Sequence, residues 1–61
     1  MMRELIEGMN VSIRNFDSDL VECGIVKMFM GKKCICVERK GKKVYIGLQV
    51  AKECYEISEV A

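Results

Sequence analysis

The chain has 61 residues, a formal net charge of +1, and no histidine, proline or tryptophan. A single domain of this size buries only about 60% of the surface that its unfolded chain exposes. Because 51% of the residues are hydrophobic, the composition predicts apolar surface left over for a partner. The chain has no histidine, no Ser or Cys beside a plausible base, and no glycine loop for phosphate. We therefore expect a non-enzymatic protein without a cofactor.

The N-terminal sequence does not resemble a secretion signal, because Arg3, Glu4 and Glu7 interrupt any apolar run. The longest uncharged apolar runs, such as Met28 to Met30, are far too short to span a bilayer. These features predict a soluble, cytoplasmic protein consisting of one domain, residues 1–61.

The first third of the chain contains a lead-in, a strand and a polar loop. In the lead-in, residues 1–7, we expect Leu5 and Ile6 to be pinned to the core. Residues 9–14 alternate apolar and polar side chains, which is typical of a half-buried strand. Residues 15–19 are rich in Asn, Asp and Ser, which bond their own backbone, so they predict a loop. Phe16 is expected to fold back onto the core.

The middle of the chain predicts a three-stranded antiparallel meander, with strands over residues 20–30, 34–38 and 44–50 and Gly/Lys turns between them. The phase of the apolar residues changes at Gly24, which indicates a bulge or a sharp bend. The third strand is apolar on both faces, which is typical of a central strand or of an interface. The core is expected to contain Met9, Val11, Ile13, Val26, Met28, Val37, Val44, Ile46 and Leu48.

The C-terminal segment admits two interpretations. Residues 51–54 suit a single tight helical turn, such as a 3-10 turn, followed by a short closing strand that includes Tyr55 and Ile57. Alternatively, Val50, Cys54 and Ile57 fit the apolar stripe of a helix over residues 50–60. We favour the strand.

This pattern resembles the SH3-like small β-barrels, a group that includes KOW and PilZ-like modules of bacteria and phages. The segment Ile6-Glu7-Gly8-Met9-Asn10-Val11-Ser12-Ile13 is similar to the first strand of these barrels and the turn before it. The resemblance implies an all-β fold, a small five-stranded SH3-like antiparallel barrel, acting as a binding module of a phage or another mobile element. It carries over no functional residues.

The charge distribution suggests where a ligand would bind. Residues 27–43 carry a net charge of +6, whereas residues 1–26 carry −3 and residues 44–61 carry −2. Lysines beside an aromatic ring can bind a phosphate backbone or another anionic ligand. The expected binding residues are Lys27, Lys32, Lys33, Arg39, Lys40, Lys42, Lys43 and Tyr45. In the alternative interpretation these lysines only keep the sheet edges soluble, and the protein is a protein–protein interaction or inhibitor module.

The four cysteines, Cys23, Cys34, Cys36 and Cys54, are expected to be free, buried thiols, because C-x-C within a strand lacks the C-x2-C geometry of zinc knuckles. No metal is expected. Since side chains alternate along a strand, one barrel cannot enclose both apolar sets of the meander. We therefore expect a homo-oligomer, a dimer, with an interface that contains Phe29, Met30, Cys34 and Cys36.

Overall fold

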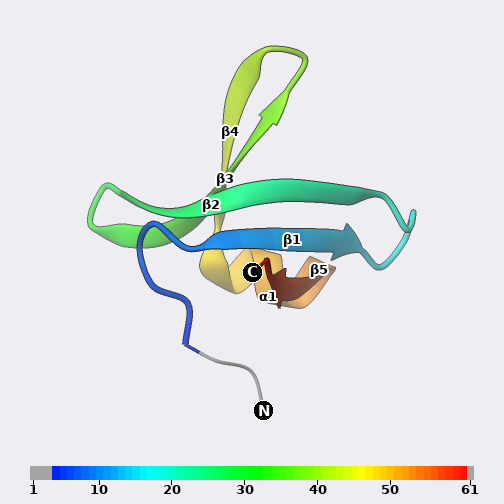
Figure 1. The fold of residues 1–61 in the computed structure, drawn as a ribbon, viewed down its shortest axis with the longest axis horizontal. Helices are drawn as coiled ribbons and strands as arrows, with labels where there is room; N and C mark the ends of the chain where they lie inside the picture. Colours follow the sequence, from blue (N-terminus) through cyan, green and yellow to red (C-terminus); the bar gives the residue numbers. More distant parts are fainter. Residues whose placement is uncertain (1–3, 61) are drawn as a thin grey trace.

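The computed structural model describes residues 4–60 of the chain (Figure 1). Its elements are β1 Asn10–Asn15, β2 Val21–Phe29, β3 Lys32–Arg39, β4 Lys42–Gly47, α1 Leu48–Cys54 and β5 Tyr55–Glu59. The strands form one antiparallel sheet in the order β4-β3-β2-β1-β5. The expected five-stranded antiparallel architecture is confirmed. Among the described residues no pairing joins the two edge strands, β4 and β5, and α1 packs against both of them and against β3.

Two tight turns build the meander. Met30 and Gly31 link β2 to β3 with φ values of 52° and 78°, and Lys40 and Gly41 link β3 to β4 with 53° and 77°. Positive φ at both central residues is the requirement of a type I′ turn, whose twist matches that of the flanking strands. Lys32 and Lys33, expected in a turn, therefore belong to β3.

Gly24 lies where β2 is paired on both sides, to β1 through Val21–Ile25 and to β3 through Gly24–Phe29. Both registers run without interruption, so β2 contains no bulge at this glycine. A Cβ at Gly24 would lie 2.8 Å from Ile35 Cγ2 and 2.9 Å from the carbonyl oxygen of Cys36. The glycine is therefore required because β3 packs directly against the backbone of β2.

The core lies between the inner face of the sheet, α1 and the lead-in. It consists of Leu5, Val11, Ile13, Val26, Ile35, Val37, Ile46, Ala51 and Ile57, with Met9, Val44, Leu48 and Tyr55 packed against it. Most of the predicted core is confirmed. Met28 is exposed instead, because it lies near the free end of the β2–β3 hairpin, and Ile6 is exposed although its neighbour Leu5 is buried. The first three residues of the lead-in lie outside the described residues.

The C-terminal segment combines the two interpretations of the sequence. A seven-residue α-helix, α1, precedes a strand, β5, so the strand is confirmed, but the expected 3-10 turn is a longer α-helix. The prediction of a strand through Leu48 and Val50 was wrong, since β4 ends at Gly47. Gln49, Ala51, Lys52 and Glu53 are good helix formers, and Ala51 is the buried residue of the helix.

The loop between β1 and β2 is held by its own polar groups. The Asn15 side-chain oxygen accepts hydrogen bonds from the backbone N–H of Asp17, at 2.7 Å, and of Ser18, at 3.3 Å. This Asx-type turn confirms the predicted polar loop. Phe16 does not fold onto the core but is exposed. Across residues 4–60, no helix reaches the length and apolar character that crossing a bilayer requires.

Candidate binding face

The meander presents an outer face, made of the side chains that point away from the core. Strand alternation and register assign to it Cys23, Ile25, Lys27, Phe29, Lys32, Cys34, Cys36, Glu38, Lys43 and Tyr45. The face therefore combines apolar groups and thiols with three lysines, against one carboxylate. It unites residues that are up to twenty-two positions apart in the sequence.

Phe29 and Tyr45 form the centre of this face. Their rings stack with centroids 4.6 Å apart and planes at 12°, a geometry favoured between aromatic side chains. Since Phe29 belongs to β2 and Tyr45 to β4, the pair spans the intervening strand β3. Both side chains remain accessible, with 45% and 40% of their surface exposed.

Cys34 lies on the outer face of β3 and is nevertheless only 7% exposed. Its strand neighbours are Lys27 and Gly47. The thiol lies 3.8 Å from the carbonyl oxygen of Lys32, to which it donates a weak hydrogen bond. Because Cys34 points outward and is nevertheless buried, its neighbours on the outer face must cover the thiol.

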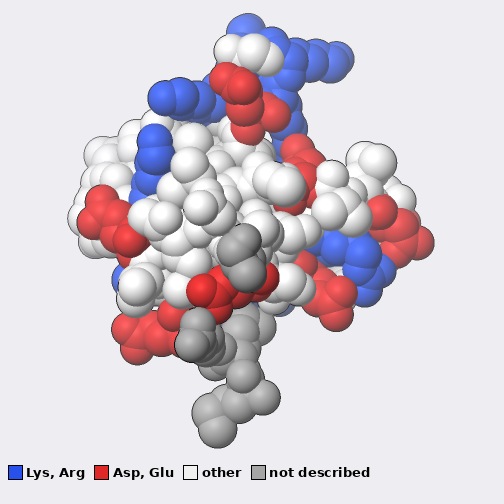
Figure 2. Space-filling model, viewed as in Figure 1, with Lys and Arg blue, Asp and Glu red and all other residues white. Residues whose placement is uncertain are grey.

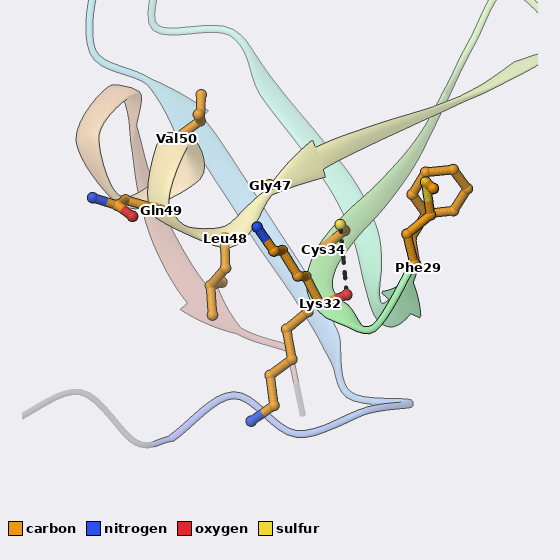
Figure 3. Close-up of a pocket in the computed structure, with 9 residues that line it drawn as sticks. Phe29, Lys32, Cys34, Gly47, Leu48, Gln49 and Val50 are labelled. Atoms are coloured by element: carbon orange, nitrogen blue, oxygen red, sulfur yellow. Dashed lines mark hydrogen bonds between the residues drawn. The ribbon is translucent and has the colours of Figure 1, made fainter.

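A groove of about 700 Å³ opens beside Phe29 (Figure 3). Phe29 borders it on one side and the first turn of α1, with Gln49 and Val50, borders it on the other. Lys32 and Cys34 lie between these two walls. The groove combines the apolar side chains of Phe29 and Val50 with the polar side chains of Gln49 and Lys32, which suits a ligand that carries both apolar and anionic groups.

Two of the predicted basic residues are engaged within the chain. The Lys33 ammonium donates a hydrogen bond to the carbonyl oxygen of Leu5, at 2.7 Å, and lies 3.8 Å from the Glu4 carboxylate. Arg39 donates two hydrogen bonds of 2.7 Å to the carboxylate of Glu22 and a further one, of 3.3 Å, to the hydroxyl of Tyr55. Lys33 thereby ties the lead-in to β3, and Arg39 ties the N-terminal end of β2 to β3.

The ion pair between Arg39 and Glu22 shifts both groups toward their charged forms. Hydrogen bonding to Glu22, and then to Tyr55, raises the pKa of the Arg39 guanidinium. The same contact lowers the pKa of the Glu22 carboxyl from its ordinary value of 4.5. Arg39 is therefore a structural residue rather than a free anion-binding group.

The other predicted basic residues form two groups. Lys27 and Lys32 flank the aromatic pair, whereas Lys40, Lys42 and Lys43 lie at or beside the tip of the β3–β4 hairpin, which projects from the molecule (Figure 2). The eight residues of β3 separate the two ends by roughly 23 Å, at a rise of about 3.3 Å per residue. Tyr45 lies between the two groups on the outer face, two residues beyond Lys43 on β4.

The cysteines and the predicted interface residues differ in accessibility. Met30 is 86% exposed and Cys36 is half-buried, but Cys34, at 7% exposed, offers little surface to a second subunit. Cys23 and Cys54 are exposed, which corrects the expectation that all four thiols are buried. Within residues 4–60 no three His, Cys, Asp or Glu side chains lie close enough together to hold a metal ion.

The sequence predicted Tyr45 and the lysines as binding residues, but it did not predict the stack with Phe29 or the α1 wall of the groove. Alternation along the strands indicated that both rings face outward, yet nothing in the sequence set their separation. A comparison with known families, curated proteins and solved structures finds no match to the chain. The geometry of the outer face is therefore the basis for assigning a function.

Proposed function

We propose that the protein is a non-enzymatic binding module of the SH3-like small-barrel type that binds single-stranded nucleic acid on its outer face. The observation that carries this proposal is the half-exposed pair of Phe29 and Tyr45 flanked by lysines. The barrel assignment is supported by the long strand β2, which pairs with β1 and β3 through different halves, and by the helical segment before β5.

The chemistry of the face suits a single strand better than a duplex. A base stacks on an exposed aromatic ring only when it is itself unstacked, and such contacts contribute about 1–3 kcal/mol per base. Because the two rings cover one face of each other, a base could stack only on the opposite face of either ring. Lys27, Lys32 and Lys43, which make no ion pair among the described residues, are placed to contact the phosphates.

Fluorescence anisotropy with labelled twelve-nucleotide oligo(dT) and oligo(U) tests the proposal, at salt concentrations from 50 to 200 mM. The double variant Lys27→Gln/Lys32→Gln should weaken binding and reduce the slope of log K against log[salt] by about 1.4, at about 0.7 per phosphate contact. Lys52→Gln is the matched control, because Lys52 is an exposed lysine on α1. The control should bind like the unmodified protein.

Tyr45→Ala tests the stacking contribution and should lower affinity by about 1–3 kcal/mol. Phe16→Ala is its control, because Phe16 is an exposed aromatic residue in the β1–β2 loop. If neither oligonucleotide, nor a duplex of the same length, binds at 50 mM salt, the proposal is wrong and the lysines serve solubility.

The exposed apolar end of the β2–β3 hairpin favours a second candidate function, a protein–protein interaction module that works as a homodimer. Met30 is 86% exposed, and Phe29, Ile25 and Tyr45 are exposed on strands of the same meander. Exposed apolar clusters of this kind usually mark interaction surfaces. Light scattering coupled to gel filtration distinguishes a monomer from a homodimer. A mass of 7.0 kDa at micromolar concentration would eliminate the dimer.

A further inference from the structure

The β4 strand is an edge of the sheet and pairs only with β3. The two-residue turn makes Arg39 and Lys42 a hydrogen-bonded pair, and such pairs recur at every second residue along an antiparallel ladder. Val44 and Ile46 therefore also direct their backbone groups to β3. The N–H and C=O groups of Lys43 and Tyr45 point the other way, and no backbone hydrogen bond among residues 4–60 engages them.

This edge has the features of a template for another strand. Its register with β3 is regular over all six residues of β4. The strand contains no proline and no bulge, two of the means by which proteins block pairing at an edge, and the third, charged side chains, is present only as lysines at one end. Tyr45 on the outer side and Val44 and Ile46 on the inner side give an added strand apolar neighbours. The stack with Phe29 holds the Tyr45 ring in place.

The charges of the edge select among the strands that could pair with it. Lys42 and Lys43 lie side by side in sequence on β4 with their side chains on opposite faces of the sheet, and Lys40 lies in the adjoining turn. None of the three makes an ion pair with a described residue. Like charges on neighbouring strands repel and opposite charges attract. The lysines therefore favour an acidic strand over a basic one.

We propose that the β4 edge is the docking strand for an extended, acidic segment of a partner protein, which adds to the sheet antiparallel to β4. The residues of β4 specify the order of apolar and acidic residues in the segment. It places apolar residues opposite Ile46, Tyr45 and Val44, followed toward the C-terminus by acidic residues opposite Lys43 and Lys42. This edge lies outside the groove but shares Lys43 and Tyr45 with the outer face. The inference rests on the backbone of β4 and does not depend on nucleic-acid binding.

The probe is the capped peptide Ser-Val-Ile-Val-Glu-Glu, and the matched control peptide is Ser-Val-Ile-Val-Lys-Lys, both with a fluorescent label. Anisotropy should show that the acidic peptide binds at least about tenfold more tightly at low salt, since two opposite-charge pairs replace two like-charge pairs. Amide hydrogen exchange followed by NMR locates the contact. Saturating peptide should slow exchange of the Lys43 and Tyr45 N–H groups about tenfold or more, while the Val44 and Ile46 amides are already slow.

Two substitutions at Lys43 separate the contribution of its backbone N–H to peptide binding from that of its side-chain charge. Lys43→Pro removes the outward N–H, which proline permits at a sheet edge, and should weaken binding of the acidic peptide at least about tenfold. Lys43→Gln keeps the N–H and should weaken binding of the acidic peptide only about threefold. Circular dichroism checks that the proline variant is folded. If it is not, the exchange of the Lys43 and Tyr45 amides in the unmodified protein decides the question.

Three outcomes would overturn the proposal: equal binding of the two peptides, no binding of either, or binding without protection of the Lys43 and Tyr45 amides. Protection of these amides in the peptide-free protein, together with twice the mass of 7.0 kDa, would show that a second copy occupies the edge. Lys27→Gln/Lys32→Gln should bind the acidic peptide normally, so failure of this inference and failure of nucleic-acid binding are separate results.

Discussion

Replacing Gly24 by alanine should destabilise the protein more than any other glycine-to-alanine change in the sheet. The added Cβ would lie 2.8 Å from Ile35 Cγ2, 2.9 Å from Val37 Cγ1 and 2.9 Å from the Cys36 carbonyl oxygen. The two side chains belong to the core, and the carbonyl is part of the backbone, so none of these atoms moves freely. Overpacking of this kind costs about 1–3 kcal/mol, a large part of the roughly 3–5 kcal/mol that a single core of this size supplies.

Thermal unfolding followed by circular dichroism measures the effect. A loss of about 2 kcal/mol should lower the midpoint by about 8–16 °C in a domain of this size. Gly47→Ala is the matched control, because Gly47 also lies in a strand of the meander and a Cβ there meets nothing within 4 Å. The control should change stability by no more than about 0.5 kcal/mol. Equal midpoints for the two variants would refute the argument that β3 packs against the backbone of β2.

Three further predictions concern the thiols and the ion pair. Iodoacetamide under native conditions, followed by mass spectrometry, should label Cys23 and Cys54 readily but Cys34 only after unfolding; early labelling of Cys34 would contradict its burial. Phe29→Ala should expose Cys34 and make it react in the folded state, and an unchanged rate would show that the ring does not cover the thiol. Because the Arg39 guanidinium lowers the pKa of the folded Glu22 carboxyl from its ordinary value of 4.5, this carboxylate stabilises the fold above that pH and loses the effect as the pH falls further. In urea titrations, Glu22→Gln should therefore lower the free energy of unfolding by about 0.2–1 kcal/mol at pH 7 and by less at pH 3. A loss of stability that is the same at both pH values would exclude this linkage.

The sequence predicts the strands well because their signals are local. Alternating apolar residues identify β1, and Gly31 and Gly41 mark tight turns whose geometry sets the registers of the meander. The start of α1 was not predictable by the same means, since Leu48 and Val50 satisfy both the strand period and the helical period. The choice between the two depends on packing of Ala51 in the core, which is a tertiary contact.

The candidate site was harder to predict than the fold because it depends on side-chain reach. Alternation along the strand correctly assigned Cys34 to the outer face, but an outward side chain is not necessarily exposed. The rings of Phe29 and Tyr45 stack across β3, and Cys34 on the same face is buried. Likewise, the positive charge of Arg39 was visible in the sequence, whereas its pairing with Glu22 required the register of β2 and β3.

The order of strand pairing has a consequence for how the chain folds. β2, β3 and β4 are joined by two-residue turns, so their pairing closes only short loops, a process that takes microseconds in hairpins. Pairing of β1 with β5 brings together segments from opposite ends of the chain and closes a loop that contains the whole meander, at a larger entropic cost. We therefore expect β5 to dock last on folding and to detach first on unfolding. The Phe29–Tyr45 pair and the β4 edge lie in the early-forming part, so they persist when the C-terminal strand opens.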